Sequence, residues 1–179
     1  MEDPWPDAWR PVGEGEFEKE EFDTWWMRNS NALANLDPLV AEQWIYRHWK
    51  GSPLRFLDVP QAHCRSEIFS TERFLSEVHL EWGRPANPEH DAHVFSLDNP
   101  RGYHAPAQNW LNGTWTIPTV VLSTPNGVVG YDGEDGECRF LLIEGSKRYR
   151  YLNALRWQGI DTGPHNVFVL TIAAGGDAD

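Results

Sequence analysis

The spacing of apolar residues predicts two helices in the amino-terminal half of the chain. Residues 38–50 and residues 70–82 each carry a stripe of apolar side chains with the period of an α-helix. Asp37 suits the N-cap of the first helix and Pro38 its first turn, and Ser70 suits the start of the second. A glycine follows each stripe, as is common where a helix ends. These glycines are Gly51 and Gly83.

The carboxy-terminal third changes to short apolar runs that are typical of strands. The runs cover residues 116–122, 139–143 and 167–172, and the middle one is almost continuously apolar, as in a buried strand. A turn signal at 125–127 and an acidic, glycine-rich loop separate the first two runs. A helix over 146–157 separates the last two. The order strand, turn, strand, helix, strand predicts one small mixed sheet.

Two further short strands are expected at residues 55–59 and at Val94-Phe95. The second lies within residues 84–114, which are rich in proline, asparagine, glycine and histidine and predict a long loop. Long loops in compact domains often serve function, so we expect this loop to cover a site.

The composition fits one domain. With 179 residues the chain can bury a core, and its 10 tryptophans offer large apolar surfaces. We expect an α+β domain over residues 24–172, in which an α-rich amino-terminal half packs on the small mixed sheet. Two cysteines are too few for a disulfide framework, which favours a reducing cytoplasm. No apolar run approaches membrane-spanning length, and no secretion signal is visible.

Acidic residues dominate the start of the chain. The net charge is −12, and residues 2–23 hold nine acidic residues against two basic ones, a net −7. We expect residues 1–23 to be a solvated acidic tail and residues 173–179 a disordered one. The aromatic residues of the leader would otherwise let it pack along the domain or dock on a basic partner. They are Trp5, Trp9, Phe17 and Phe22. The charge disfavours a duplex-DNA binder.

The segment with the clearest chemistry follows the buried strand. The apolar run Phe140–Ile143 meets Gly145, and a basic segment with Lys147, Arg148 and Arg150 comes next. Free N–H groups at the start of a helix and nearby cations suit an anion such as phosphate. An ordinary turn capped by Ser146 is the alternative. The predicted ligand-binding residues are Glu144, Gly145, Ser146, Lys147 and Arg148.

Residues 142–155 resemble the phosphate-binding motif of the ParB/sulfiredoxin-like superfamily, in which a strand ends in a hydrophobic-(Asp/Glu/Ala)-Gly-x-x-Arg pattern. Gly145 matches the glycine of that motif and Arg148 its arginine. The resemblance covers residues 115–172. It implies a sulfiredoxin-like fold and a nucleotide site with the phosphates at the helix start. A nucleoside triphosphate with Mg²⁺ is the implied ligand, with hydrolysis or phosphoryl transfer as the implied chemistry.

Ser146 departs from the family pattern. ParB-type proteins place a glutamate at this position and sulfiredoxins a cysteine, so the usual carboxylate or thiol is missing here. We therefore assign no catalytic residue, although Glu144 and His104 are weak candidates for a base. His90 and His93 have a spacing that is common by chance, and no metal site is predicted.

A second interpretation comes from another class of protein. The net charge, the tryptophans and the acidic leader are also typical of an interaction factor, immunity or antitoxin-like, that covers a basic protein. In that case the ParB-like element would be a scaffold without catalysis. The fold alone does not decide between the two interpretations.

Overall fold

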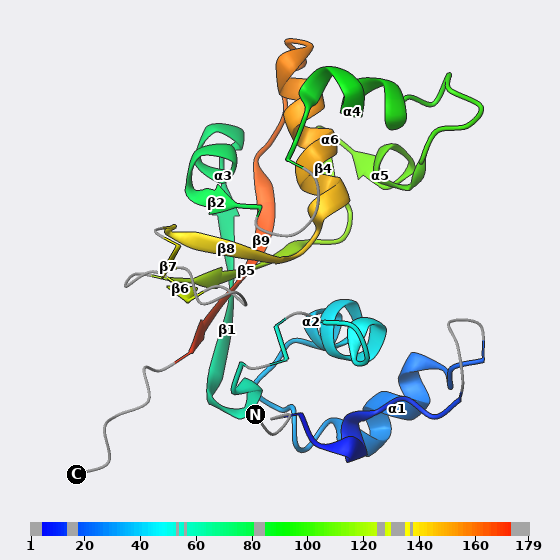
Figure 1. The fold of residues 1–179 in the computed structure, drawn as a ribbon, viewed down its shortest axis with the longest axis vertical. Helices are drawn as coiled ribbons and strands as arrows, with labels where there is room; N and C mark the ends of the chain where they lie inside the picture. The colour runs from blue at the N-terminus through cyan, green and yellow to red at the C-terminus, as the bar shows by residue number, and fades with distance from the viewer. Residues whose placement is uncertain are drawn as a thin grey trace.

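The computed structural model describes residues 5–13, 18–52, 54–55, 57–80, 85–124, 128–129, 135–136 and 138–172. Within these residues the fold is mixed α/β and is built on a five-stranded mixed sheet with the order β1-β9-β5-β8-β2 (Figure 1). The strands of this sheet are β1 (Ala62–Phe69), β2 (Val78–His79), β5 (Thr119–Ser123), β8 (Phe140–Glu144) and β9 (His165–Ile172).

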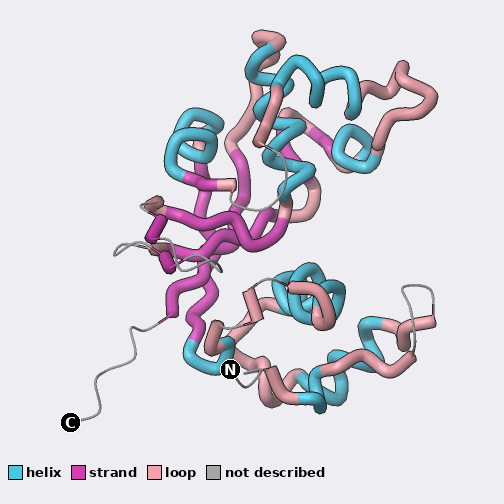
Figure 2. The backbone as a smooth tube through the Cα atoms, in the orientation of Figure 1, coloured by secondary structure: helices cyan, strands magenta, loops and turns pink. Residues whose placement is uncertain are grey.

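Helices lie on two sides of the sheet, as Figure 2 shows by colour. The α-helices are α1 (Phe22–Asn29), α2 (Pro38–Val40), α3 (Thr71–Glu77), α4 (Pro88–Val94), α5 (Ala105–Gln108) and α6 (Ser146–Trp157). A π-helix, η2 (Ala41–Tyr46), continues α2, and the 3₁₀ turns are η1 (Asp7–Trp9) and η3 (Val59–Gln61). Two small hairpins pair β3 (Trp110–Leu111) with β4 (Thr114–Trp115) and β6 (Val128–Val129) with β7 (Asp135–Gly136).

The three strands predicted in the carboxy-terminal third lie together in one sheet and form its centre. Strand β5 pairs antiparallel with β8 and parallel with β9, and α6 connects β8 to β9. Strand β1 extends the sheet antiparallel to β9, and β2 extends it parallel to β8. The prediction of one mixed sheet is confirmed.

Alternate residues of the central strands face two separate cores. On β5, Val120 and Leu122 pack against the amino-terminal helices, whereas Val121 faces α3 and α6. Trp25 and Trp44 fill the first core together with other apolar side chains of that layer. The sheet is thus covered on both faces, and Figure 1 shows α1 and α2 on the opposite side of it from α3 and α6.

The prediction of a solvated leader is wrong for its described part. Trp5 is 2% exposed and Trp9 is 4% exposed. The indole Nε1 of Trp25 donates a hydrogen bond of 2.7 Å to the carbonyl oxygen of Trp9, and the rings of Trp5 and Trp44 meet edge to face. Asp7, Glu18, Glu21 and Asp23 stay exposed, so the tryptophans bury their large rings without taking these charges out of water. The leader packs along the domain, which was the alternative.

Both predicted N-caps are present. Asp37 accepts a hydrogen bond from the Leu39 amide at 2.9 Å, and Ser70 accepts one from the Arg73 amide at 3.1 Å. The second helix ends earlier than predicted, because β2 begins at Val78, a buried residue that pairs with β8. The predicted helix end at Gly83 is therefore wrong. Residues 125–127, 130–134 and 173–179 lie outside the described part, so the predictions of a turn, an acidic loop and a tail there stay predictions.

The predictions of short strands at residues 55–59 and at Val94-Phe95 are wrong. Residues 54–55 form a turn and η3 covers Val59–Gln61, and the strand begins only at Ala62. Val94 ends helix α4, whose start is capped by Asn87 through the His90 amide at 3.0 Å. The segment 84–114 therefore carries α4, α5 and the β3–β4 hairpin in place of a long loop.

Candidate functional site

The turn between β8 and α6 requires a glycine. Gly145 has a φ of 116°, in the left-handed region. A Cβ at this position would lie 2.6 Å from Cγ2 of Thr119, a side chain of the neighbouring strand β5. The predicted tight turn is confirmed. Capping by Ser146 is wrong, because Gly145 occupies the N-cap position and no side chain caps α6.

Arg148 lies over this glycine and is held at both ends of its guanidinium group. Its Nη2 donates to Oε1 of Gln43 at 2.7 Å, and its Nη1 donates to the carbonyl oxygen of Ile117 at 3.0 Å. Its Nε lies 3.1 Å from where a Cβ of Gly145 would stand. The side chain is 16% exposed. Burial lowers the pKa of Arg148 to about 10, so the group still carries its charge at neutral pH.

Glu144 places a carboxylate beside the same turn. Its Oε2 lies 3.2 Å from Nε2 of His48, and its Oε1 lies 3.7 Å from Nη2 of Arg148. Burial acts to raise the pKa of Glu144, but the hydrogen bond from His48 and the charges of Arg148 and Arg47 lower it below its usual value. Glu144 is therefore ionised at neutral pH and poorly suited to act as a general base, which needs a pKa near the working pH.

The three predicted cations do not converge. Lys147 places its Nζ 3.7 Å from the centre of the Tyr103 ring. Arg150 binds Asp91 through two nitrogens, the shortest contact being 2.6 Å, and Asp91 is 1% exposed. Two positions along an α-helix turn the side chain by about 200°, so Arg150 faces away from Arg148. Of the three cations, only Arg148 lies over Gly145 at the start of α6. Lys147 and Arg150 instead contact residues of the segment 84–114, which packs along the helix.

A buried hydroxyl lies at the same turn. Thr119 is fully buried, its side chain lies against Gly145, and its Oγ1 has no hydrogen-bond partner among the described residues. A buried polar atom without a partner costs free energy and calls for an explanation, such as a ligand. Thr119, Gln43 and His48 extend the predicted set of site residues. The sequence offers no signal for them, because all three lie far from the motif in the chain and only the fold brings them to it.

The histidines of the segment 84–114 do not form a metal centre. No group of three potential metal ligands occurs within the described ranges. His104 donates from Nε2 to the carbonyl oxygen of Asn99 at 2.7 Å, since a carbonyl only accepts. His90 and His93 lie on α4 on either side of the buried Asp91.

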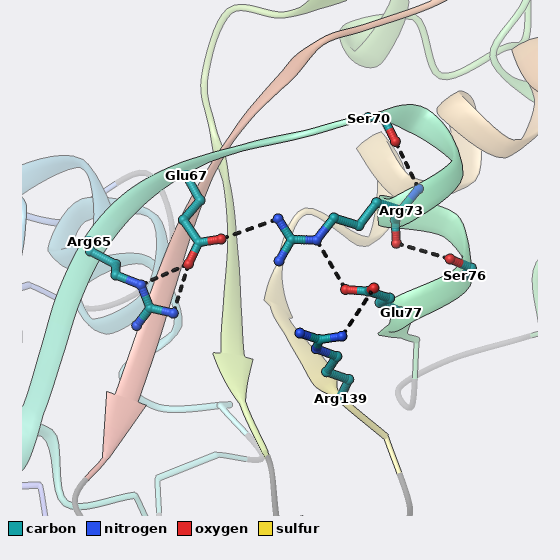
Figure 3. A network of polar contacts seen from close by, with 7 residues as sticks. All are labelled: Arg65, Glu67, Ser70, Arg73, Ser76, Glu77 and Arg139. Carbon is teal, nitrogen blue, oxygen red and sulfur yellow. Dashed lines mark hydrogen bonds and ion pairs between the residues drawn. The ribbon is translucent and has the colours of Figure 1, made fainter.

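A separate cleft of about 530 Å³ lies beside β2. Its lining includes Glu77, His79, Arg139 and Tyr149. Glu77 and Arg139 belong to a row of alternating charges that runs from β1 across α3 to the start of β8 (Figure 3). None of the predicted ligand-binding residues lines this cleft.

Comparison with protein-family models, with curated proteins and with solved structures finds no match for this chain. Among the described residues, no helix has the length and apolar character needed to cross a membrane. The arrangement around Gly145 is therefore the main guide to function.

Proposed function

We propose that this chain binds a phosphate-bearing ligand, specifically a nucleotide, at the amino end of α6, as the ParB/sulfiredoxin-like resemblance implies. The supporting observation is the pairing of Gly145 with Arg148. Gly145 starts a twelve-residue helix with no capping side chain, and Arg148 is held over the glycine. The first N–H groups of a helix lack intrahelical partners and carry a partial positive charge, which favours an anion.

The surroundings of Arg148 favour a preorganised contact. Gln43 and Ile117 fix the orientation of the guanidinium group, which carries more N–H donors than these two bonds use. The remaining donors suit phosphate oxygens, which arginine binds in a forked geometry. The unpartnered hydroxyl of Thr119 supplies one more polar group against the turn.

The ionised carboxylate of Glu144 bears on the form of the ligand. A carboxylate next to a phosphate repels it unless a cation lies between them. Mg²⁺ commonly binds one or two carboxylates together with phosphate oxygens. Glu144 therefore favours a nucleoside triphosphate bound with Mg²⁺ over free phosphate. We propose no catalytic residue for hydrolysis or phosphoryl transfer, because Ser146 supplies neither the carboxylate nor the thiol of the family pattern.

The coarse topology agrees with this proposal. Within residues 115–172, strands β5, β8 and β9 belong to the same sheet, and α6 connects β8 to β9. This is the order of elements that the resemblance implies. The interpretation as an interaction factor depends on an acidic leader that is free to bind a partner. Trp5 and Trp9 anchor the described part of that leader in the core, which removes the free tail as support for a basic partner.

Thermal-shift and calorimetric titrations test the proposal. The ligands are ATP, ADP, CTP, GTP and inorganic phosphate, each with and without Mg²⁺. Arg148→Lys keeps the charge and removes the fork, and Arg156→Gln removes an exposed cation at the far end of α6 as a matched control. We expect a nucleotide to raise the Tm of the parent, with affinity at least about tenfold lower in Arg148→Lys.

Two results would contradict the proposal. The first is the absence of any shift with every ligand on a folded protein. The second is a shift that Arg148→Lys and Arg156→Gln change equally, since that would place the anion elsewhere. The first result would direct the search to a protein partner, and the second to another anion site.

A further inference from the structure

Strand β1 forms one edge of the sheet and leaves a long row of backbone groups on its outer side. Among the described elements, β1 is hydrogen-bonded to β9 alone. It has eight residues, contains no proline and pairs with β9 without a register shift. Proteins usually protect such an edge with a proline, a bulge or a very short strand, and none of these is present here. The remaining common protections are a covering segment and charge. Asn35 donates from Nδ2 to the carbonyl oxygen of Ala62, the first residue of the strand, at 2.7 Å, and Arg65 and Glu67 supply the charge.

From the pattern of these charges we infer that two copies of this chain pair through their β1 strands. The pairing is antiparallel about a two-fold axis at Ser66, and it joins the two five-stranded sheets into one continuous sheet. Such an interface uses the same surface on both copies. The inference concerns the opposite edge from the cleft beside β2, and it does not depend on the proposed nucleotide site.

The register follows from symmetry. A two-fold axis perpendicular to the sheet keeps each side chain on its own face, so the axis lies midway between the two copies of one residue of β1. With the axis at Ser66, Arg65 of each copy lies opposite Glu67 of the other. An axis at Arg65 would place two arginines opposite each other, and an axis at Glu67 two glutamates. Opposite charges across a strand pair stabilise it and like charges destabilise it, so the register at Ser66 is favoured.

The other face of the strand agrees with this register. Ile68, a large apolar side chain, is 61% exposed in the single copy. In the paired sheet it lies opposite Cys64 of the other copy, a half-buried residue whose thiol packs against the first core. Both Ile68 side chains thereby gain an apolar neighbour, and the central Ser66 residues lie opposite each other.

The charged pair is already ordered in the single copy. Nε of Arg65 lies 2.8 Å from Oε1 of Glu67, and Oε2 of Glu67 lies 3.3 Å from Nη1 of Arg73, as Figure 3 shows. Arg65 also donates to Oγ1 of Thr171 at 2.8 Å. Pairing two copies would join two such rows of alternating charge, so no charge at the interface is left without an opposite neighbour.

Two charge reversals give a sharp test. Arg65→Glu places glutamates opposite each other in the proposed register, and Glu67→Arg places arginines opposite each other. A mixture of the two variants restores both opposite-charge pairs in a heterodimer. We expect the parent to dimerise, each variant alone to dimerise at least about tenfold more weakly, and the mixture to recover the parent affinity. Sedimentation velocity at about 0.15 M salt measures all three.

Controls separate the edge from general effects of charge and folding. Arg139→Glu reverses an exposed charge at the far end of the same row and should leave dimerisation unchanged. Ile68→Lys tests the other face and should weaken the dimer even if a charge reversal fails to fold. A parent that stays monomeric up to about 300 µM overturns the inference. So does a mixture that assembles no better than its components, which would mean that the charges protect the edge from pairing.

Discussion

Nη2 of Arg148 donates a hydrogen bond of 2.7 Å to Oε1 of Gln43, a residue 105 positions earlier in the chain. Gln43 lies in the π-helix η2 and is 3% exposed. Its own Nε2 donates to the carbonyl oxygen of Leu39 at 3.1 Å, so the amide is oriented from both ends. The bond connects the helical layer on one face of the sheet to the start of the helix on the other. Local π-helical geometry is frequent at functional sites, which agrees with a role in positioning Arg148.

Gln43→Leu should destabilise the protein and loosen the proposed ligand site. The substitution removes the acceptor of a buried guanidinium, and leaving such a donor unsatisfied costs about 1–3 kcal/mol. We expect the free energy of unfolding, measured by denaturant titration, to fall by that amount. Gln158→Leu at the exposed end of α6 should change it by less than about 0.5 kcal/mol. Equal stability of Gln43→Leu and the parent would show that the bond does not hold Arg148.

Gly145→Ala should be much more costly than Gly159→Ala. Both glycines have a positive φ, but a Cβ at Gly145 meets Thr119 at 2.6 Å, whereas nothing lies within 4 Å of a Cβ at Gly159. Backbone strain alone costs about 1 kcal/mol at each position, and the clash adds about 1–3 kcal/mol at Gly145. Chemical unfolding of both variants measures the difference. Thr119→Ser removes the Cγ2 atom that the new Cβ would meet, so in the Gly145→Ala background it should recover part of the lost unfolding free energy. No recovery would mean that the protein relieves the clash in another way.

The centre of the fold can be predicted from the sequence because local residues define it. Strand β8 carries the apolar run Phe140–Ile143, Gly145 follows the strand, and α6 begins at the next residue. Asp37 and Ser70 mark helix starts by the same local chemistry. In each of these cases the information lies within a few residues, which is the range over which caps and turns act.

The rest of the fold depends on residues that are far apart in the chain. Strand β1 shows no apolar alternation, because Arg65, Ser66 and Glu67 lie at an edge where both faces are partly open to solvent. The orientation of Arg148 depends on Gln43 and on the Ile117 carbonyl, which no pattern near the motif indicates. The acidic leader follows the composition of a tail, yet its tryptophans are buried by helices that come later in the chain.

The buried His165 should make the protein less stable in mild acid. It is fully buried between the hydroxyls of Thr71 and Thr114, each 2.9 Å from a ring nitrogen, and it stacks on Trp115. Burial lowers the pKa of His165 from 6.5 to about 4, opposed by the charge of Glu72. The unfolded chain therefore binds the proton first, so stability is complete above pH 6.5 and falls as the pH drops toward 4.

The total loss from His165 is about 3 kcal/mol, since each unit of pKa shift corresponds to about 1.4 kcal/mol. Urea unfolding between pH 7 and pH 4 measures it. His165→Gln abolishes this dependence while leaving that of the carboxylates, whose stabilising effect is lost only at lower pH. Glu144 and Glu20, whose pKa values are lowered, belong to that second group. A parent and a His165→Gln variant with the same slope between pH 6.5 and 4.5 would rule out His165 as the cause.

Asp91→Asn should destabilise the packing of α4 on α6. Asp91 is 1% exposed and accepts hydrogen bonds from Arg150, so its removal leaves a partly buried guanidinium without its counter-charge. Breaking such a pair from one side costs about 3 kcal/mol. The exposed pair of Glu72 and Arg156, 3.7 Å apart, is a matched comparison, and Glu72→Gln should cost less than about 1 kcal/mol. Thermal unfolding of both variants measures the two losses of stability. Equal losses would contradict the idea that the burial of Asp91 makes its pair the more important one.

Trp9→Ala should reveal whether the acidic leader is part of the folded core. Trp9 is 4% exposed, and its carbonyl oxygen accepts the indole N–H of Trp25. Truncating a buried tryptophan costs about 3–5 kcal/mol, a large share of the stability of an ordinary domain. We expect a strong fall in Tm together with a change in the near-ultraviolet circular dichroism of the tryptophan cluster. Val12→Ala, at a position 63% exposed in the same leader, should leave both signals unchanged. If Trp9→Ala behaved like Val12→Ala, the leader would not contribute to the core.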